Sequence, residues 1–421
     1  MSVRGALSIL GVLAVLSAGL VGLVSRAPAN VRRAEVAAGA REPDRGARFS
    51  AEQVRRAAAY NRPSYLAVAL LALLRGGLLV ALALGPWGRL VDALQGVKGG
   101  WAVRAVLAAW ILVALAGVVT LPVTFVHGFV IEHAWGLSTQ GVGGWATDRL
   151  RSLLVGGCTT AVAAVAFFGV VRWQPRTWWL WGWGAFTLLT ALLVFIWPLV
   201  VAPLFNRFTP LDDPELREAV TDLARGAGVE VSAVLVADAS RRTRTENAYV
   251  AGLGETRRLV LYDTLLEGQG RRETLWVVGH ELGHEAERHV LKGVVLSAAG
   301  LLVGFGALAW LAARPGVWAW AGSGGVADLK ALPVLLLFAT VAGLLVTPVE
   351  NAVSRGFERR ADAIAMELTR DPDTAVGVLR GLALRNLSDL EPPSLAVAFL
   401  YSHPPVPERI RNALAWGHST R

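Results

Sequence analysis

Long apolar stretches restrict this chain to folds that cross a lipid bilayer. A helix needs about 20 predominantly apolar residues to cross the hydrocarbon core of a membrane. Seven such stretches with few charges run along the sequence: Ala6 to Val24, Tyr65 to Leu84, Ala105 to Val130, Leu153 to Val171, Trp178 to Val201, Val290 to Ala313, and Leu332 to Val349. The composition agrees, because 54% of the residues are hydrophobic and only 17% are charged, where soluble domains have roughly 25% charged residues. We therefore expect a mainly α-helical protein with seven transmembrane helices.

The first two stretches each carry a feature that bears on their interpretation. Arg4 precedes the first, and Ala27 and Ala29 follow it, which is the pattern of a signal peptide. We favour a retained membrane anchor, because the stretch is longer than the roughly 7 to 15 apolar residues of a signal-peptide core. Arg75 interrupts the second stretch, and a charge at membrane depth usually faces a protein interior or a watery cavity.

Basic residues orient the chain in the membrane. Nine arginines lie between the first two spans, from Arg26 to Arg62, whereas the three loops expected on the other side hold only two or three basic residues each. Basic loops favour the cytoplasmic side, so we expect this Arg-rich linker, and by parity residues 202–289 and 350–421, to face the cytoplasm. The formal net charge of +9 comes from scattered arginines and not from a basic stripe beside aromatic residues, so no nucleic-acid partner is expected.

The spans divide the chain into five expected parts. They are an anchor and Arg-rich linker in residues 1–63, spans two to five in 64–201, a first polar part in 202–289, spans six and seven in 290–349, and a second polar part in 350–421. The first polar part has a helical pattern at Asp213–Gly226, strand patterns at Val231–Val236, Asn247–Ala251 and Leu259–Tyr262, and a charged helix from near Gly270. The second is mainly helical, with breaks at the prolines near 392 and 404.

A metal-binding motif stands near the end of the first polar part. Within Arg271 to Lys292 the sequence reads His280-Glu281-Leu282-Gly283-His284, and an offset of four residues on a helix points both imidazoles toward one ion. Glu281 then lies beside the metal, where it can take a proton from metal-bound water and pass it to the departing amine. Two unrelated surface histidines are the alternative. We favour the metal site, because the chain has only seven histidines and this pair completes the motif.

A catalytic zinc usually has three protein ligands and one open position, so a third ligand is needed. One known pattern places a third histidine six residues beyond the second, where this chain has Val290. His289 is one residue off, and we interpret it as solvated or as an outer partner of a ligand. A glutamate on the next helix is excluded, because residues 290–313 are an apolar span without one. Two crossings return the chain to the same side of the membrane, where Glu358 stands just after the seventh span.

Glu358 and Asp362 are four residues apart and share a helix face. Glu358 can bind zinc, while Asp362 accepts a hydrogen bond from a ligand histidine and fixes its tautomer. Taken alone, two carboxylates among arginines would be ordinary exposed ion pairs between neighbouring helix turns. The topology and the missing third ligand favour the metal site. With one cysteine in the chain, Cys158, no cysteine-rich alternative exists.

Three more residues are candidates for the site. Asn247 begins a strand along which a peptide could pair, and its side chain could hold a peptide amide, although an ordinary strand of the small domain is equally compatible. His403, before Pro404 and Pro405, could donate a hydrogen bond to an oxyanion, with Arg409 nearby. A lone histidine in a proline turn is usually structural, so the residue pattern alone leaves this role open.

Six segments spread over the chain are together similar to one family. They are Ala202–Leu211, Asn247–Leu265, the helix around His280, Ser354–Ala365, Glu132–Gln140 and Ser402–Arg409. The chain resembles the CAAX prenyl protease type 1 family of integral-membrane zinc metallopeptidases, with the Arg26–Arg62 linker poorly matched. The resemblance implies seven helices around an intramembrane chamber, with a small α+β zincin-like domain at the cytoplasmic end. Arg75 would then line the chamber.

The resemblance also implies a role for each candidate residue. His280, His284 and Glu358 become ligands of one Zn²⁺, Glu281 the general base and Asp362 an outer partner of the ligands, with Asn247, His403 and Arg409 as active-site groups. We expect a zinc metalloendopeptidase of a bacterial plasma membrane that acts on a peptide or membrane-protein substrate, no prenyl group being assigned to it. The alternatives are an intramembrane site-2-type metalloprotease, whose zinc helix would lie inside a span, and a non-catalytic membrane scaffold or transporter.

Overall fold

The structure, a computed structural model, describes residues 12, 15, 16, 19, 49–252 and 254–419. The expected first span, Ala6 to Val24, and the expected linker as far as Arg48 lie mostly outside the described residues. In the described part, six helical segments are long and apolar enough to cross a membrane: Ala51–Ala83 (α3), Gly100–Ala134 (α5, η1 and α6), Val142–Trp173 (α7), Trp178–Phe205 (α8, η2 and α9), His289–Ala312 (α13) and Leu329–Thr369 (η5 and α15). Each overlaps one of the expected spans two to seven.

Two membrane helices extend well beyond their apolar stretches. Helix α3 begins at Ala51, where Ser50 and Gln53 form a capping box: the Ser50 side chain accepts the Gln53 backbone N–H, and the Gln53 side chain accepts that of Ser50. Residues 51–62 of the expected linker are therefore helical. Helix α15 runs unbroken from Leu332 to Thr369 and passes through Pro348, so the last span and Glu358 belong to one helix.

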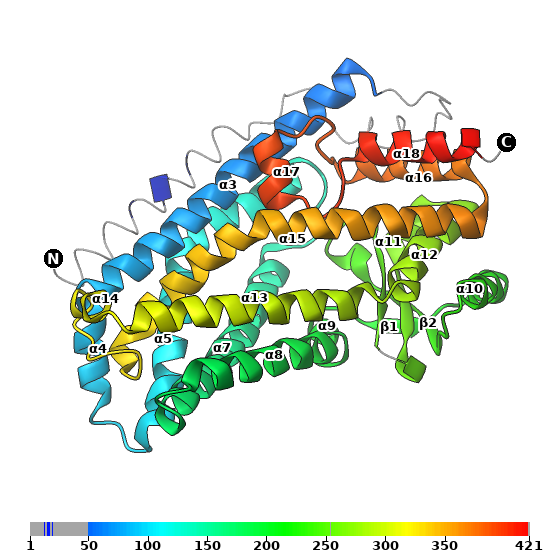
Figure 1. Ribbon diagram of the computed structural model, residues 1–421. Coiled ribbons are helices and arrows are strands. Elements are labelled where there is room, and N and C mark those ends of the chain that lie inside the picture. Colours follow the sequence, from blue (N-terminus) through cyan, green and yellow to red (C-terminus); the bar gives the residue numbers. More distant parts are fainter. Residues whose placement is uncertain (1–11, 13–14, 17–18, 20–48, 253, 420–421) are drawn as a thin grey trace.

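The membrane helices form one half of the molecule (Figure 1). Their inner faces share a core that includes Leu78, Val123 and Phe168, each at most 1% exposed. Their outer faces carry bare apolar side chains, such as Val303 on α13 and Leu345 on α15. Such continuous apolar surface is covered by lipid in a membrane protein, which agrees with the expected bilayer environment. Short helices α4 (Pro86–Leu94) and α14 (Pro315–Ala319) lie at the end of the bundle remote from the sheet.

A four-stranded sheet forms the centre of the other half. Its strands are β1 (Phe208–Pro210), β2 (Ala233–Ala237), β3 (Ala248–Ala251) and β4 (Arg258–Tyr262), in the order β1-β2-β4-β3. Only β2 and β4 are parallel. Because β3 pairs with β4 alone, its other edge is free of strand partners among the described residues. The three expected strands are confirmed, whereas the three-residue β1, which ends in a proline, was not expected.

Helices cover the sheet and carry the functional residues. They are α10 (Pro214–Gly226), α11 (Asp263–Gly268), α12 (Arg271–Ala286), α16 (Pro372–Arg385) and α18 (Val406–Ser419), whereas α17 (Ser394–Leu400) packs on α15. A second core joins them, with Val220, Leu259, Val278 and Leu379 at most 1% exposed. The expected helices at 214–226 and from Gly270 are confirmed. Pro407 does not break the chain but lies in the first turn of α18, where the missing N–H costs nothing.

Candidate metal centre

Three potential metal ligands converge where helices α12 and α15 meet. The Nε2 atoms of His280 and His284 lie 3.2 Å apart, and they lie 3.2 and 3.3 Å from the two carboxylate oxygens of Glu358. Atoms held about 2.1 Å from a tetrahedral ion lie about 3.4 Å from one another. In addition, the buried Oε2 atom of Glu358 has no hydrogen-bond partner among the described residues. The group therefore fits a shared metal ion.

Glycine lets the two ligand helices approach this closely. A Cβ atom at Gly283 would lie 3.0 Å from the Cα atom and 3.1 Å from the carbonyl oxygen of Ala361. One turn earlier, a Cβ atom at Gly279 would lie 3.3 Å from the Cα atom of Ala365. Backbone therefore packs against backbone beside the histidines, which brings the carboxylate of Glu358 within reach of both rings.

The outward-facing nitrogen of His280 is bound by a buried ion pair. Asp362 Oδ1 lies 2.9 Å from His280 Nδ1, and Arg409 donates to both oxygens of Asp362, from Nη2 at 2.6 Å and from Nε at 2.8 Å. Burial opposes the charge of Arg409, but Asp362 raises the pKa of its guanidinium above the usual value. The Asp362–His280 contact leaves Nε2 of the ring directed at Glu358.

His289 lies against the other ligand histidine. Its Nδ1 atom is 3.0 Å from Nδ1 of His284, and its ring stacks on Phe357 with the centroids 4.3 Å apart. The residue is only 6% exposed. Of the two interpretations that the sequence allowed, the structure favours an outer partner of a ligand over a solvated side chain.

Arg288, in the left-handed region at φ 54°, makes the turn that separates α12 from α13.

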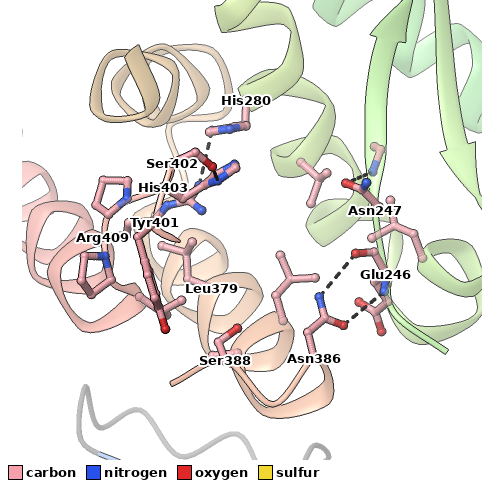
Figure 2. Close-up of a pocket in the computed structure, with 18 of the residues that line it drawn as sticks. Glu246, Asn247, His280, Leu379, Asn386, Ser388, Tyr401, Ser402, His403 and Arg409 are labelled. Atoms are coloured by element: carbon pink, nitrogen blue, oxygen red, sulfur yellow. Dashed lines mark hydrogen bonds between the residues drawn. The ribbon is translucent and has the colours of Figure 1, made fainter. Parts of the chain in front are cut away.

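Glu281 faces a cavity of about 380 Å³ beside the three ligands. Burial raises the pKa of its carboxyl group, while the neighbouring His280 and His284 lower it. Asn247, His403 and Arg409 line the same cavity, and Figure 2 shows Asn247 and His403 on opposite walls of it. All the residues that the sequence singled out as candidate site residues therefore lie at the cavity or at the three ligands.

His403 belongs to the turn between α17 and α18. Its Nε2 atom lies 3.3 Å from Oε2 of Glu358, and its Nδ1 atom lies 3.0 Å from the hydroxyl of Ser402. The ring therefore lies beside the ligand group and is carried by a segment other than α12 and α15. This position is compatible with a donor that faces the bond to be cleaved, because it is held next to the ligand group and open to the cavity.

Asn247 stands at the start of the edge strand, between two cavities. Besides the first cavity, it lines a second of about 510 Å³ that follows the strand from Tyr249 to Ala251 and the adjoining Gly252. The far wall of the second cavity comes from the membrane segment Trp178–Phe205, including Phe195 and Trp197. An extended peptide on the free edge of β3 would have space on both sides of Asn247.

The sequence did not indicate a buried carboxylate next to Asn247. Glu246 is 6% exposed, accepts hydrogen bonds from Gln269 (2.7 Å) and from Arg385 (3.0 Å), and has its backbone N–H bound by the side-chain oxygen of Asn386 (3.3 Å). Burial raises the pKa of Glu246 to about 7, although Arg385 opposes the shift. No local pattern links residue 246 to residues 385 and 386, so spacing could not have found this cluster.

A ligand group of this geometry, joined to a membrane bundle, defines a membrane-embedded metalloendopeptidase. Sequence comparison then gives the family: residues 210–417 match peptidase family M48, and residues 40–207 match the CAAX prenyl protease N-terminal region with five membrane helices. The chain belongs to peptidase family M48, and the expected relationship to CAAX prenyl proteases is confirmed. This assignment sets aside the site-2-type and scaffold alternatives, and α12 is not one of the six apolar segments.

Several known proteins are similar over most of the chain. The uncharacterized metalloprotease YhfN of Bacillus subtilis is 34% identical over 306 residues, which cover 72% of each chain. CAAX prenyl protease 1 of Saccharomyces cerevisiae is 30% identical over 318 residues, 71% of this chain and 70% of the yeast protein. The crystal structure of S. mikatae Ste24p has the same fold, with a TM-score of 0.73 at 21% identity over 97% of this chain and 98% of that chain.

Proposed function

We propose that the protein is a zinc-dependent endopeptidase of a bacterial plasma membrane that cleaves peptides or membrane proteins on the cytoplasmic side. The observation that carries the proposal is the spacing of His280, His284 and Glu358, whose donor atoms lie 3.2 to 3.3 Å apart. Two imidazoles and one carboxylate are the ligand set of many catalytic zinc sites with an open fourth position. When bound there, zinc supplies a Lewis acid and lowers the pKa of water.

The residues around the ligands would carry out the proton transfers and hold the substrate. Glu281 accepts a proton from the attacking water and later gives it to the departing amine nitrogen, a task suited to a carboxyl group whose pKa burial has raised. His403 donates a hydrogen bond to the oxyanion. Asn247 holds a peptide amide of a substrate that pairs with the edge of β3, and Asp362 with Arg409 keeps His280 oriented.

We infer a seven-span topology in which the two polar parts of the chain form one zincin-like domain in the cytoplasm. Six described segments fit the membrane by length and composition, and an even number of crossings returns the chain to the side from which α3 starts. The nine arginines that precede and begin α3 favour the cytoplasm for that side. The five-part division, with an anchor before residue 63, belongs to the same proposal, and the resemblance to CAAX prenyl proteases implies an intramembrane chamber among the helices.

The test is a cleavage assay on the purified full chain, with zinc content measured on the same samples. We expect one zinc per chain in the wild type and in Glu281→Gln, and a fall in kcat of about 10²- to 10⁴-fold in the variant. Glu273→Gln, on the same helix but away from the cavity, is the control. In Glu358→Ala we expect zinc to be lost. Undiminished cleavage by Glu281→Gln, or full zinc occupancy in Glu358→Ala, would contradict the assigned roles.

A further inference from the structure

We propose that Tyr65, on membrane helix α3, is a positioning residue for His403 and acts through Tyr401 and Asp389. This inference depends on the proposed role of His403 as an oxyanion donor. It gives α3 a part in the reaction, although the helix contributes no residue to the ligand group or to the cavity of about 380 Å³.

The ring of His403 needs external support. Its side chain is 58% exposed, and its polar contacts in the described structure are with Ser402 and Glu358. Ser402 is itself exposed. Because no core packing surrounds the imidazole, its position depends on the backbone of the turn that carries it, and therefore on whatever holds Tyr401, two residues earlier.

A chain of three side chains connects that turn to the membrane bundle. Tyr65 donates from its hydroxyl to Oδ2 of Asp389 at 2.7 Å, and the same hydroxyl lies 2.8 Å from that of Tyr401. A tyrosine has one hydroxyl proton. Since the proton of Tyr65 goes to the carboxylate, Tyr401 must donate to Tyr65. Asp389 is 5% exposed, so this is a buried, directional link and not a contact between mobile surface groups.

A second anchor fixes the backbone of the same turn. Arg355 donates from Nη1 to the carbonyl oxygens of Tyr401 at 2.8 Å and of Val397 at 2.9 Å. Arg355 lies on α15, three residues before Glu358. Tyr401 is therefore held by its backbone to the helix that carries a ligand, and by its hydroxyl to α3. Removing the hydroxyl contact with α3 would leave the turn held only by its backbone contacts with Arg355, about which it could rotate.

The segment that supplies Asp389 is itself tied to α3 and to the edge strand. Asn61, one turn before Tyr65, donates to the carbonyl oxygen of Leu387 at 2.7 Å. Leu387 lies in the left-handed region at φ 50° with its side chain buried, a conformation that only surrounding contacts maintain. Next to it, Asn386 accepts the backbone N–H of Glu246 at 3.3 Å. Asp389 is thus a fixed reference point for the hydroxyl of Tyr65.

The first experiment compares Tyr65→Phe with Ser64→Ala in peptide cleavage. Tyr65→Phe removes one hydroxyl and keeps the ring, and we expect kcat to fall about five- to tenfold, with KM changed less than twofold and zinc content unchanged. Ser64→Ala removes the hydroxyl of the preceding residue, which in the described structure donates only to a backbone carbonyl of its own helix. This variant should leave kcat unchanged. A kcat of Tyr65→Phe within twofold of wild type would overturn the proposal.

A double-mutant cycle separates this proposal from the one on which it depends. His403→Ala should lower turnover on its own, measured with enzyme in excess of peptide. If Tyr65 acts through His403, Tyr65→Phe should cause no further loss in the His403→Ala background. Equal losses in both backgrounds would show that Tyr65 acts elsewhere and would refute the positioning role. Full activity in His403→Ala would instead refute the proposed role of His403 itself.

Discussion

Asp362 holds the nitrogen of His280 that faces away from the ligand group, with Oδ1 2.9 Å from Nδ1. The two residues are on different helices, α12 and α15, yet each helix also supplies a ligand. The contact therefore orients one ligand and at the same time fixes the distance between the two helices. The bidentate contact from Arg409 sets the carboxylate plane and adds α18 to the arrangement.

Asp362→Asn should weaken metal binding without unfolding the protein. The amide still offers an oxygen to His280, but it loses the negative charge and turns an NH₂ group toward Arg409. We expect the affinity for zinc to fall about 10- to 100-fold, measured by competition with a chelator. Asp373→Asn, at an exposed position on α16, should bind zinc as the wild type does. Equal affinities in the two variants would mean that Asp362 does not support the ligand.

Gly283→Ala should force α12 and α15 apart. The added methyl would lie 3.0 to 3.1 Å from backbone atoms of Ala361, and overpacking of this kind costs about 1–3 kcal/mol. We expect a lower midpoint of thermal unfolding together with weaker zinc binding, since Glu358 moves with α15. Gly293→Ala places the same methyl on α13, where no atom lies within 4 Å, and should not reduce stability. Normal zinc affinity in Gly283→Ala would argue against close backbone packing as a requirement.

Asn247→Ala should raise KM more than it lowers kcat. An amide that holds the peptide backbone acts on the bound substrate and on the transition state alike, and loss of such uniform binding appears in KM. One lost hydrogen bond predicts about a 3- to 10-fold rise in KM. Asn412→Ala, exposed on α18, is the control. If kcat fell and KM stayed constant, Asn247 would have to contact the reacting group instead.

Glu246→Gln should change how stability depends on pH. Burial raises the pKa of Glu246 to about 7 in the folded protein, against about 4.3 in an unfolded chain. Between these values the folded state binds the proton more tightly, so the contribution of Glu246 to stability is present below pH 4.3 and is lost as the pH rises toward 7. Glutamine does not titrate. We therefore expect the unfolding midpoint of the wild type, relative to that of Glu246→Gln, to decrease as the pH rises from about 4.3 to about 7.

The control for this measurement is Glu267→Gln, which changes an exposed carboxylate on α11. Its difference from the wild type should stay constant over the same pH range. The interpretation fails if the difference for Glu246→Gln is equally constant, since the carboxylate would then have a similar pKa in the folded and unfolded states.

The ligand group and the spans were accessible from the sequence, because each depends on a local pattern. Apolar length predicts a span, and the four-residue offsets of His280–His284 and Glu358–Asp362 predict shared helix faces. Because the chain crosses the membrane twice between these two pairs, both helix faces lie on the same side and can meet. The three expected strands were likewise found from short apolar runs, whereas β1 is too short to produce a pattern.

Contacts between segments far apart in the chain could not be predicted from the sequence. Tyr65 marked only the start of an apolar stretch, and its partner Asp389 is 324 residues away. Glu246 and Arg385 are similarly separated by 139 residues. The continuation of α15 from Val349 to Thr369 was also not predicted, because apolar length marks only the part of a helix that crosses the membrane.

Pro348 removes one backbone hydrogen bond from α15, so the helix can bend there. Pro348 precedes Glu358 by ten residues, which is about 15 Å along a helix, so a bend of about 8° at the proline would displace the carboxylate by about 2 Å. Metal–ligand distances tolerate only about 0.2 Å. The contacts of α15 with α12, at Gly283 and between Asp362 and His280, therefore hold this part of the helix in place. Glu358 thus owes its position to its neighbours on α12 and not to the membrane part of its own helix.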